Sequence, residues 1–242
     1  MRTTRIYTDQ PLDAFATIEL GKEAAHHLVT VLRLKQGHPV CLFDGQGGEY
    51  PGEIVAAGPR SVTVRTANHN PENRQSPLKT LLGIGISRAE RFEWVLQKAT
   101  ELGVTEIFPL YTERTEVKLR GDREDRKQAR WQQVLASACE QSGRNLLPVL
   151  HSPRPLLDWQ AIDADAKLLL HHRATASLQS LSAEQPGSVA LLIGPEGGLS
   201  PAEIETAIAS GFQAIALGPR IFRTETAPIA ALGIIQWLWG DL

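Results

Sequence analysis

The chain has 242 residues, of which 42% are hydrophobic, and its formal net charge is −2. This composition predicts one or two soluble domains and argues against a protein that coats nucleic acid over its whole surface. No apolar run approaches the ~18 residues that cross a bilayer, and the amino end lacks the apolar core of a signal peptide, so we expect a cytoplasmic protein with no membrane partner. Cys41 and Cys139 stand far apart and outside any zinc motif, and no metal site is predicted.

Short strand patterns separated by turn residues fill the first part of the chain. The runs that predict strands are residues 18–20, 39–43, 50–56 and 61–65. Asp44-Gly45 indicates a hairpin turn, and the spacing of apolar residues predicts a helix over residues 22–33. The polar segment 69–77 contains two prolines. We therefore expect a small β-barrel or β-rich domain over residues 1–72 and a second domain over residues 73–242.

Strands and helices alternate in the second part of the chain. Apolar runs predict strands over residues 78–86, 104–110, 167–170, 189–193 and 214–217. Helical patterns stand between several of these runs, one of them over about residues 124–142. This alternation predicts right-handed crossovers and a mostly parallel sheet, which makes the fold class α/β.

Two helices carry start signals. Ser87 with Glu90, and Ser200 with Glu203, have the spacing of a capping box. Gly211 is suited to end the second of these helices. The last helical run, residues 228–239, is apolar nearly all round, so we expect it to be covered on every side, either in the core or in a subunit interface.

Two glycine-containing loops follow apolar strands and precede helical patterns. The first is residues 194–198, Gly-Pro-Glu-Gly-Gly, and the second lies within residues 217–227. Loops at the carboxyl ends of strands bind small ligands in open α/β sheets, and glycine lets the backbone approach a ligand closely. Neither loop matches a phosphate-binding motif, which disfavours a nucleoside triphosphate or a dinucleotide. From these residues alone, plain turn geometry explains the glycines equally well.

Residues 112–130 contain seven basic and five acidic side chains. A local basic surface on an acidic protein is compatible with a nucleic-acid partner. Mixed signs are more often a solvated helix face, and charge alone favours that interpretation by roughly two to one.

Six segments occur together in the order typical of one known family. They are residues 5–7 (Arg-Ile-Tyr), 31–33 (Val-Leu-Arg), 97–104, 138–144, 193–198 and 217–226. Over essentially its whole length the chain resembles the RsmE family of ribosomal RNA small subunit uracil-N3-methyltransferases, in the SPOUT superfamily. One departure is Phe222, where the family usually has leucine.

The resemblance implies a fold, a cofactor and partners. The fold is a PUA-like amino-terminal β-barrel followed by an α/β SPOUT domain threaded into a trefoil knot. The cofactor is S-adenosylmethionine (SAM), held by the knot loops of a homodimer. The substrate is ribosomal RNA of the small subunit, in the assembled 30S particle, and the reaction is methylation of N3 of a specific uridine in 16S ribosomal RNA.

The resemblance also implies roles for individual residues. Arg223 is expected to stabilise the uracil anion or to hold a phosphate, with a salt bridge to Glu225 or Glu196 as the structural alternative. Glu225 is a candidate acceptor for the imide proton. The residues expected to bind SAM are Leu170, His171, Gly194, Pro195, Glu196, Gly197, Gly198, Leu217, Gly218, Ile221, Phe222, Thr224 and Thr226. The residues expected to contact RNA are Arg5, Arg33, Arg91, Arg114, Lys118, Arg120 and Arg144.

Two other functions stay open at this point. The chain could instead be an enzyme of the same fold that methylates a ribose 2′-hydroxyl of transfer RNA and not uracil. A non-catalytic RNA-binding factor of ribosome assembly could keep the knot and give no heat of SAM binding.

Overall fold

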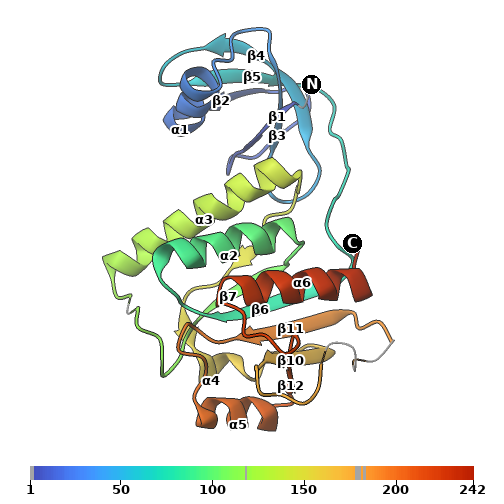
Figure 1. Ribbon diagram of the computed structural model, residues 1–242. Coiled ribbons are helices and arrows are strands. Elements are labelled where there is room, and N and C mark those ends of the chain that lie inside the picture. The colour runs from blue at the N-terminus through green and yellow to red at the C-terminus, as the bar shows by residue number, and fades with distance from the viewer. Residues whose placement is uncertain (1–2, 118, 178–180, 182–183) are drawn as a thin grey trace. The chain divides into compact units, whose positions relative to one another are not determined.

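The chain divides into two compact units. The computed structural model describes residues 3–117, 119–177, 181 and 184–242 (Figure 1). The first unit contains Met1–Gln75 and Ala136–Leu147, and the second contains Ser76–Leu135 and Pro148–Leu242. A short segment far along the chain thus belongs with the amino-terminal residues, which the sequence pattern gave no reason to expect.

The first unit is built on a curled five-stranded sheet with the strand order β1-β3-β4-β5-β2. Strand β1 lies parallel to β3, and the other neighbours pair antiparallel. The predicted β-rich character and the hairpin between β3 and β4 are confirmed, whereas β1 was not predicted. The elements are β1 (Thr4–Tyr7), β2 (Thr17–Leu20), α1 (Lys22–Ala25), a π-helical continuation (His26–Val31), β3 (Pro39–Phe43), β4 (Tyr50–Ala57) and β5 (Val62–Thr66).

A buried ion-pair network joins residues 136–147 to this sheet. Arg5 on β1 pairs with Glu49, and the two side chains are only 9% and 10% exposed. The Nη2 atom of Arg5 also donates a hydrogen bond to the carbonyl of Arg144 at 3.0 Å. Arg74 donates from Nη1 to the carbonyl of Gly143 at 2.9 Å and lies 3.4 Å from Glu49. Charges that are buried in this way are stable only when they are paired, so the network fixes residues 136–147 within the first unit.

Glu49 gives this unit a pH-dependent stability. Burial opposes ionisation of Glu49, but the hydrogen bond and charge of Arg5, followed by those of Arg74, outweigh burial and hold the pKa below its ordinary value of 4.5. A lowered carboxyl pKa stabilises the folded state above the ordinary pKa. This contribution is lost as the pH falls through the lowered value.

Glu49→Gln should lower the free energy of unfolding by on the order of 3 kcal/mol at neutral pH, because the substitution leaves the buried Arg5 without its counter-ion. Urea denaturation measures this loss, and the difference from wild type should shrink at pH values below 4.5. Glu53→Gln, at an exposed position of β4, is the matched control. Equal urea midpoints for the two variants would show that the network contributes nothing.

The second unit contains a seven-stranded sheet with the order β12-β10-β11-β6-β7-β8, and β9 also pairs with β7. Every strand pair in it is parallel, as predicted. The elements are β6 (Lys79–Gly85), α2 (Ala89–Glu101), β7 (Glu106–Tyr111), α3 (Asp122–Ser142, of which residues 136–142 belong to the first unit), β8 (Val149–Leu150), β9 (Arg154–Pro155), α4 (Leu156–Trp159), β10 (Ala166–Leu170), β11 (Ser188–Ile193), α5 (Pro201–Ala209), β12 (Gln213–Ile215) and α6 (Thr226–Trp239).

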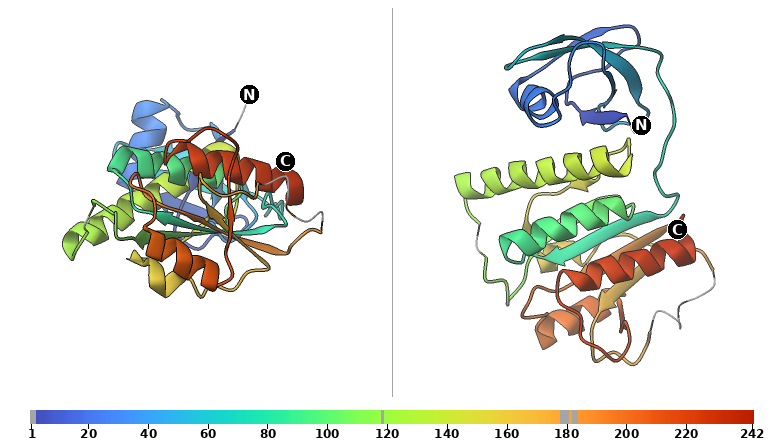
Figure 2. Two further views of the ribbon diagram at one scale, coloured as in Figure 1. Left: turned by 60° about the horizontal axis from the view of Figure 1, so that its bottom comes forward. Right: turned by 45° about the horizontal axis from the view of Figure 1, so that its top comes forward.

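Side chains of this sheet alternate between two cores. On β11, Val189, Leu191 and Ile193 pack in one core with residues of α2 and α6, whereas Ala190 and Leu192 pack in the other with residues of α4 and α5. Figures 1 and 2 show α2 and α6 on one face of the sheet and α4 and α5 on the other. Because both faces are covered, the strands can be continuously apolar, which is the pattern seen in the sequence.

The capping box of α5 is confirmed. The N–H of Glu203 donates to Ser200 Oγ at 3.2 Å, and the carboxylate of Glu203 accepts from the N–H of Ser200 at 2.8 Å. Gly211, with φ of +92°, follows the end of the helix as expected.

The capping box predicted at Ser87 and Glu90 is wrong. Helix α2 begins one residue later, and its first flanking residue, Arg88, makes no side-chain cap. The N–H of Arg88 instead donates to the carboxylate of Glu196 at 3.2 Å. The carboxylate of Glu196, from a distant loop, therefore takes the place expected of the Glu90 carboxylate, and the described residues give Ser87 Oγ no hydrogen-bond partner.

Helix α6 buries one face and leaves the other open. Ala231, Leu232 and Ile235 are buried against the sheet. Trp237 is 71% exposed, and Ile234 and Leu238 are 39% and 40% exposed. The expectation that this helix is covered on every side is therefore not met within one chain. Among the described residues, no helix combines the length and apolar character needed to cross a membrane.

Candidate functional site

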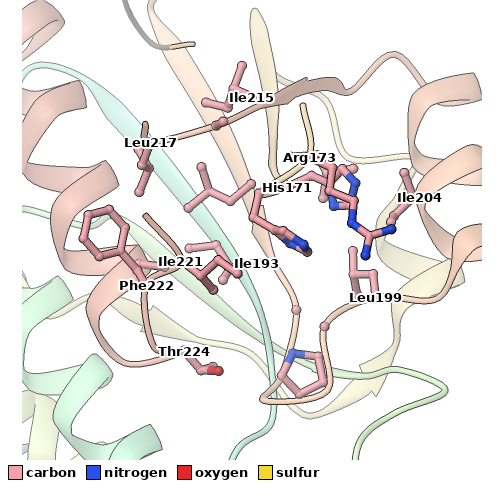
Figure 3. Close-up of a pocket in the computed structure, with 18 of the residues that line it drawn as sticks. His171, Arg173, Ile193, Leu199, Ile204, Ile215, Leu217, Ile221, Phe222 and Thr224 are labelled. Atoms are coloured by element: carbon pink, nitrogen blue, oxygen red, sulfur yellow. The ribbon is translucent and has the colours of Figure 1, made fainter. Parts of the chain in front are cut away.

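Three loops meet at one edge of the second unit's sheet. Strands β10, β11 and β12 are parallel neighbours, so their carboxyl ends lie at the same edge. The loops that follow them include residues 171–173, 194–198, 216–218 and 220–222, and these residues line a cavity of about 620 Å³ (Figure 3). This is where open α/β sheets bind small ligands.

The 194–198 loop packs against itself and against the end of β6. A Cβ on Gly85, the last residue of β6, would lie 2.5 Å from Cδ of Pro195. A Cβ on Gly194 would lie 2.9 Å from the carbonyl carbon of Gly198. Real Cβ atoms essentially never approach other atoms this closely, so glycine is required at both positions.

Arg114 holds this loop from outside, and Glu203 anchors the segment that carries Arg114. Arg114 donates from Nη1 to the carbonyl of Gly197 at 2.8 Å. The N–H of Glu113 donates to Glu203 at 2.9 Å, so the buried carboxylate that caps α5 also anchors the segment that carries Arg114. A Cβ on Gly197 would lie 3.0 Å from Cβ of Arg114. The absence of a side chain on Gly197 therefore lets Arg114 approach the loop closely.

Glu196 ties the same loop to α2. Its Oε1 accepts from Arg91 Nη1 at 3.3 Å, in addition to the bond from Arg88. The Nε of Arg91 lies 4.0 Å from Oε2 of Glu225, the residue before α6. Arg91 thus stands between a carboxylate of the glycine loop and a carboxylate at the start of the last helix.

The pocket has an apolar wall and a basic wall. Figure 3 shows Leu217 and Phe222 on one side and His171 and Arg173 on the other. Burial, followed by the charges of His172 and Arg173, lowers the pKa of His171 below its ordinary value of 6.5. The described residues contain no group of three or more His, Cys, Asp or Glu side chains that could hold a metal ion.

The cavity fits SAM in size and in shape. Its volume of about 620 Å³ lies within the range of roughly 300–1,000 Å³ common for ligands of this class. Gly198 and Gly218 have positive φ values of +67° and +110°, and a Cβ on either would meet no protein atom within 4 Å. The space beside both glycines is therefore open to a ligand. Leu170 and Phe222 line the cavity with apolar surface suited to an adenine ring.

The structure brings nearly all the predicted SAM-binding residues together. Thr226 does not line the cavity, because it begins α6 and its N–H donates to the carbonyl of Arg223 at 2.9 Å. Arg223 and Glu225 lie in the same turn, beside the lining residue Thr224, and their predicted catalytic roles stay predictions. The predicted residues that line the cavity are Leu170, His171, Gly194, Pro195, Glu196, Gly197, Gly198, Leu217, Gly218, Ile221, Phe222 and Thr224.

The predicted RNA-contacting residues do not form one group. Arg5 and Arg144 are buried in the first unit, where Arg144 also donates to Gln75, so their positive charge is used internally. Arg33 and Arg120 are exposed. Arg91 and Arg114 hold the glycine loop, as described above. Lys118 lies outside the described residues.

Sequence reasoning missed two arginines of the pocket. Arg173 and Arg220 both line the cavity and are exposed. Arg220 stood in a segment that resembles the family, and Arg173 follows the end of β10 by three residues. Their positions at the carboxyl ends of adjacent strands were the available signal.

Gly194→Ala should abolish detectable SAM binding, because the added Cβ would displace the backbone of Gly198 and Leu199 and open the loop. Isothermal titration calorimetry measures the binding. Gly21→Ala, where an added Cβ meets nothing within 4 Å, is the control and should bind SAM normally. Unchanged affinity in the first variant would mean that SAM does not depend on this loop.

Comparison with known proteins agrees with this geometry. Residues 74–236 match the family described as an RNA methyltransferase domain, and residues 20–66 match an RNA methyltransferase PUA domain. The ribosomal RNA small subunit methyltransferase E of Buchnera aphidicola is 35% identical, with 100% of this chain and 98% of that protein covered. The protein of the same name from Bacillus subtilis is 32% identical, with 95% and 93% covered.

Solved structures show the same similarity. A Legionella pneumophila protein in complex with SAM matches with a TM-score of 0.96 and 41% identity over 100% of both chains. The ribosomal RNA small subunit methyltransferase E of Neisseria gonorrhoeae, bound to SAM, matches with a TM-score of 0.91 and 33% identity, again over 100% of both chains. The chain therefore belongs to the ribosomal RNA small subunit methyltransferase E family of SAM-dependent RNA methyltransferases.

Proposed function

We propose that this enzyme methylates N3 of a specific uridine in 16S ribosomal RNA, and that it acts in the cytoplasm on the assembled 30S particle. The observation that carries the proposal is the course of the loop that leaves β12. Residues 216–218 and 220–222 line the cavity, and the chain then continues directly into Arg223 and Glu225. An anion-stabilising cation and a proton acceptor are the two groups that methylation of an imide nitrogen needs.

Glu225 is the proposed proton acceptor. SAM, when bound, supplies an electrophilic methyl group, and N3 of uracil must lose its proton to receive it. The Oε2 atom of Glu225 is buried and has no hydrogen-bond partner among the described residues, and its ion pair with Arg91 is long, at 4.0 Å. The hydrogen-bonding capacity of this carboxylate oxygen is therefore unused within the protein, and we propose that it accepts the proton from N3 once bound RNA uncovers it.

Arg223 is the proposed anion partner. Its side chain is exposed and, within the described part of the chain, forms no salt bridge with either Glu225 or Glu196. A guanidinium that is not neutralised by a carboxylate can stabilise the negative charge that develops on the uracil oxygens as N3 loses its proton.

The test is methylation of small ribosomal subunits from a strain that lacks the enzyme, followed by mass spectrometry of the nucleosides. We expect 3-methyluridine, and more of it from 30S particles than from naked 16S RNA. Methyl groups on ribose 2′-hydroxyls would favour the rival activity of the fold. No methylation of either substrate, together with no heat of SAM binding in calorimetry, would favour the non-catalytic assembly factor.

Arg223→Ala should lower kcat by on the order of 10²–10³ with little change in SAM affinity, since the lost charge acts on the transition state. Single-turnover rates at saturating RNA measure this effect, with Arg60→Ala as a control at an exposed arginine outside the predicted RNA-contacting residues. A phosphate-positioning role would instead raise KM for RNA and flatten the salt dependence of binding by about one counter-ion. Wild-type behaviour in both respects would remove Arg223 from the mechanism.

We further propose that the open face of α6 is the interface of a homodimer. Ile234, Trp237 and Leu238 form an apolar strip on this helix. Helix α2 packs beside α6 and adds the half-exposed Trp94. Contiguous apolar surface of this kind is typical of a protein interface.

Trp237→Glu should convert the dimer to a monomer, because a buried unpaired carboxylate opposes association. Light scattering coupled to size-exclusion chromatography gives the mass of each variant. Ile208→Glu, at a 49% exposed apolar residue of α5, is the control and should stay dimeric. A wild-type protein that is monomeric in solution would contradict the proposed homodimer.

A further inference from the structure

The basic wall of the pocket carries more positive charge than the protein neutralises. Arg173 and Arg220 line the cavity, are exposed, and have no ion-pair partner among the described residues. The acidic residues that line the cavity are Glu196 and Glu205, and Glu196 is already paired with Arg91. Arg114 adds a third guanidinium to the lining.

This surplus charge faces a ligand that is itself positive. SAM carries a sulfonium, an ammonium and one carboxylate, so its net charge is positive at neutral pH. Its demethylated product, S-adenosylhomocysteine (SAH), keeps the ammonium and the carboxylate but loses the sulfonium charge. Like charges repel most strongly where protein displaces water, so the arginines should disfavour SAM relative to SAH.

The positive charges at the pocket wall also act on His171, which lines the same cavity. Burial, and then the charges of His172 and Arg173, lower the pKa of His171. A polyanion is the partner that complements such a surface, since guanidinium groups bind phosphate oxygens with matched geometry.

We propose that Arg173 and Arg220 form a phosphate-docking pair that couples RNA binding to SAM binding. In the free enzyme the pair weakens the affinity for SAM. When RNA backbone phosphates neutralise the two arginines, the affinity for SAM rises, and by linkage SAM raises the affinity for RNA equally. The inference rests on the proposed function only in taking RNA as the partner.

The coupling between SAM and RNA is lost when SAM is converted to SAH during turnover. Transfer of the methyl group breaks the bond between sulfur and methyl carbon and leaves the sulfur uncharged. The charge that linked cofactor and RNA is thereby lost, so SAH and RNA no longer stabilise each other. The reaction itself loosens the product complex.

The test compares wild type with the Arg173→Gln/Arg220→Gln double variant. Arg154→Gln, on β9 of the same sheet, removes one positive charge outside the pocket lining and is the control. Calorimetric titrations with SAM and with SAH are run alone and with a short single-stranded RNA present, at two salt concentrations. Arg223 is left unchanged because of its proposed role in the chemistry.

The proposal predicts that the double substitution changes the affinity for SAM but not the affinity for SAH. The double variant should bind SAM on the order of two- to fivefold more tightly than wild type in the absence of RNA, with SAH affinity unchanged. RNA should bind about tenfold more weakly, with a salt slope reduced by about two counter-ions, and should no longer increase the affinity for SAM.

Two results would overturn the proposal. Parallel weakening of SAM and SAH would show that the arginines hold the carboxylate that both ligands share. Unchanged RNA affinity and salt slope would show that the pair serves another anionic partner or none. Neither binding measurement depends on which atom of the RNA is methylated. The nucleoside analysis could therefore contradict the proposed function while this proposal holds, and the binding measurements could contradict this proposal while the proposed function holds.

Discussion

The pocket depends on the close approach of the 194–198 loop to the end of β6. Gly85 and Gly194 permit this approach, since a side chain on either would overlap Pro195 or the backbone of Gly198. Once the loop is in place, Glu196 reaches the start of α2, and Arg114 reaches the carbonyl of Gly197. Because Gly85 and Gly194 have no side chains, three separate segments can together hold the candidate cofactor site.

The first unit depends on a different constraint, the burial of charge. Segments 5–7 and 138–144 both belong to the set that carries the family resemblance, and they meet in this unit. Arg5 donates to the carbonyl of Arg144, and the N–H of Tyr7 donates to Glu140 at 2.9 Å. These motif residues are explained by folding, because their polar groups are consumed within the protein.

Sequence patterns predicted the parts of the structure that local physics decides. Apolar runs located most of the strands, and Ser200 with Glu203 three residues later located the start of α5. Tertiary contacts decided the rest. Ser87 makes no cap, because α2 begins after Arg88, whose N–H donates to Glu196. Arg5, which the resemblance assigned to RNA, is paired with Glu49, and β1 is held by pairing with the distant β3. Arg173 and Arg220 become neighbours of one pocket only through strand order, which no local pattern contains.

The most direct measurement of the central claim is a crystal structure of this protein with SAM at saturating concentration. The account predicts SAM in the cavity at the carboxyl ends of β10, β11 and β12, beside Gly198 and Gly218, with adenine against the apolar wall that contains Leu217 and Phe222. SAM bound elsewhere on the chain, or a 194–198 loop that makes no contact with it, would contradict the account.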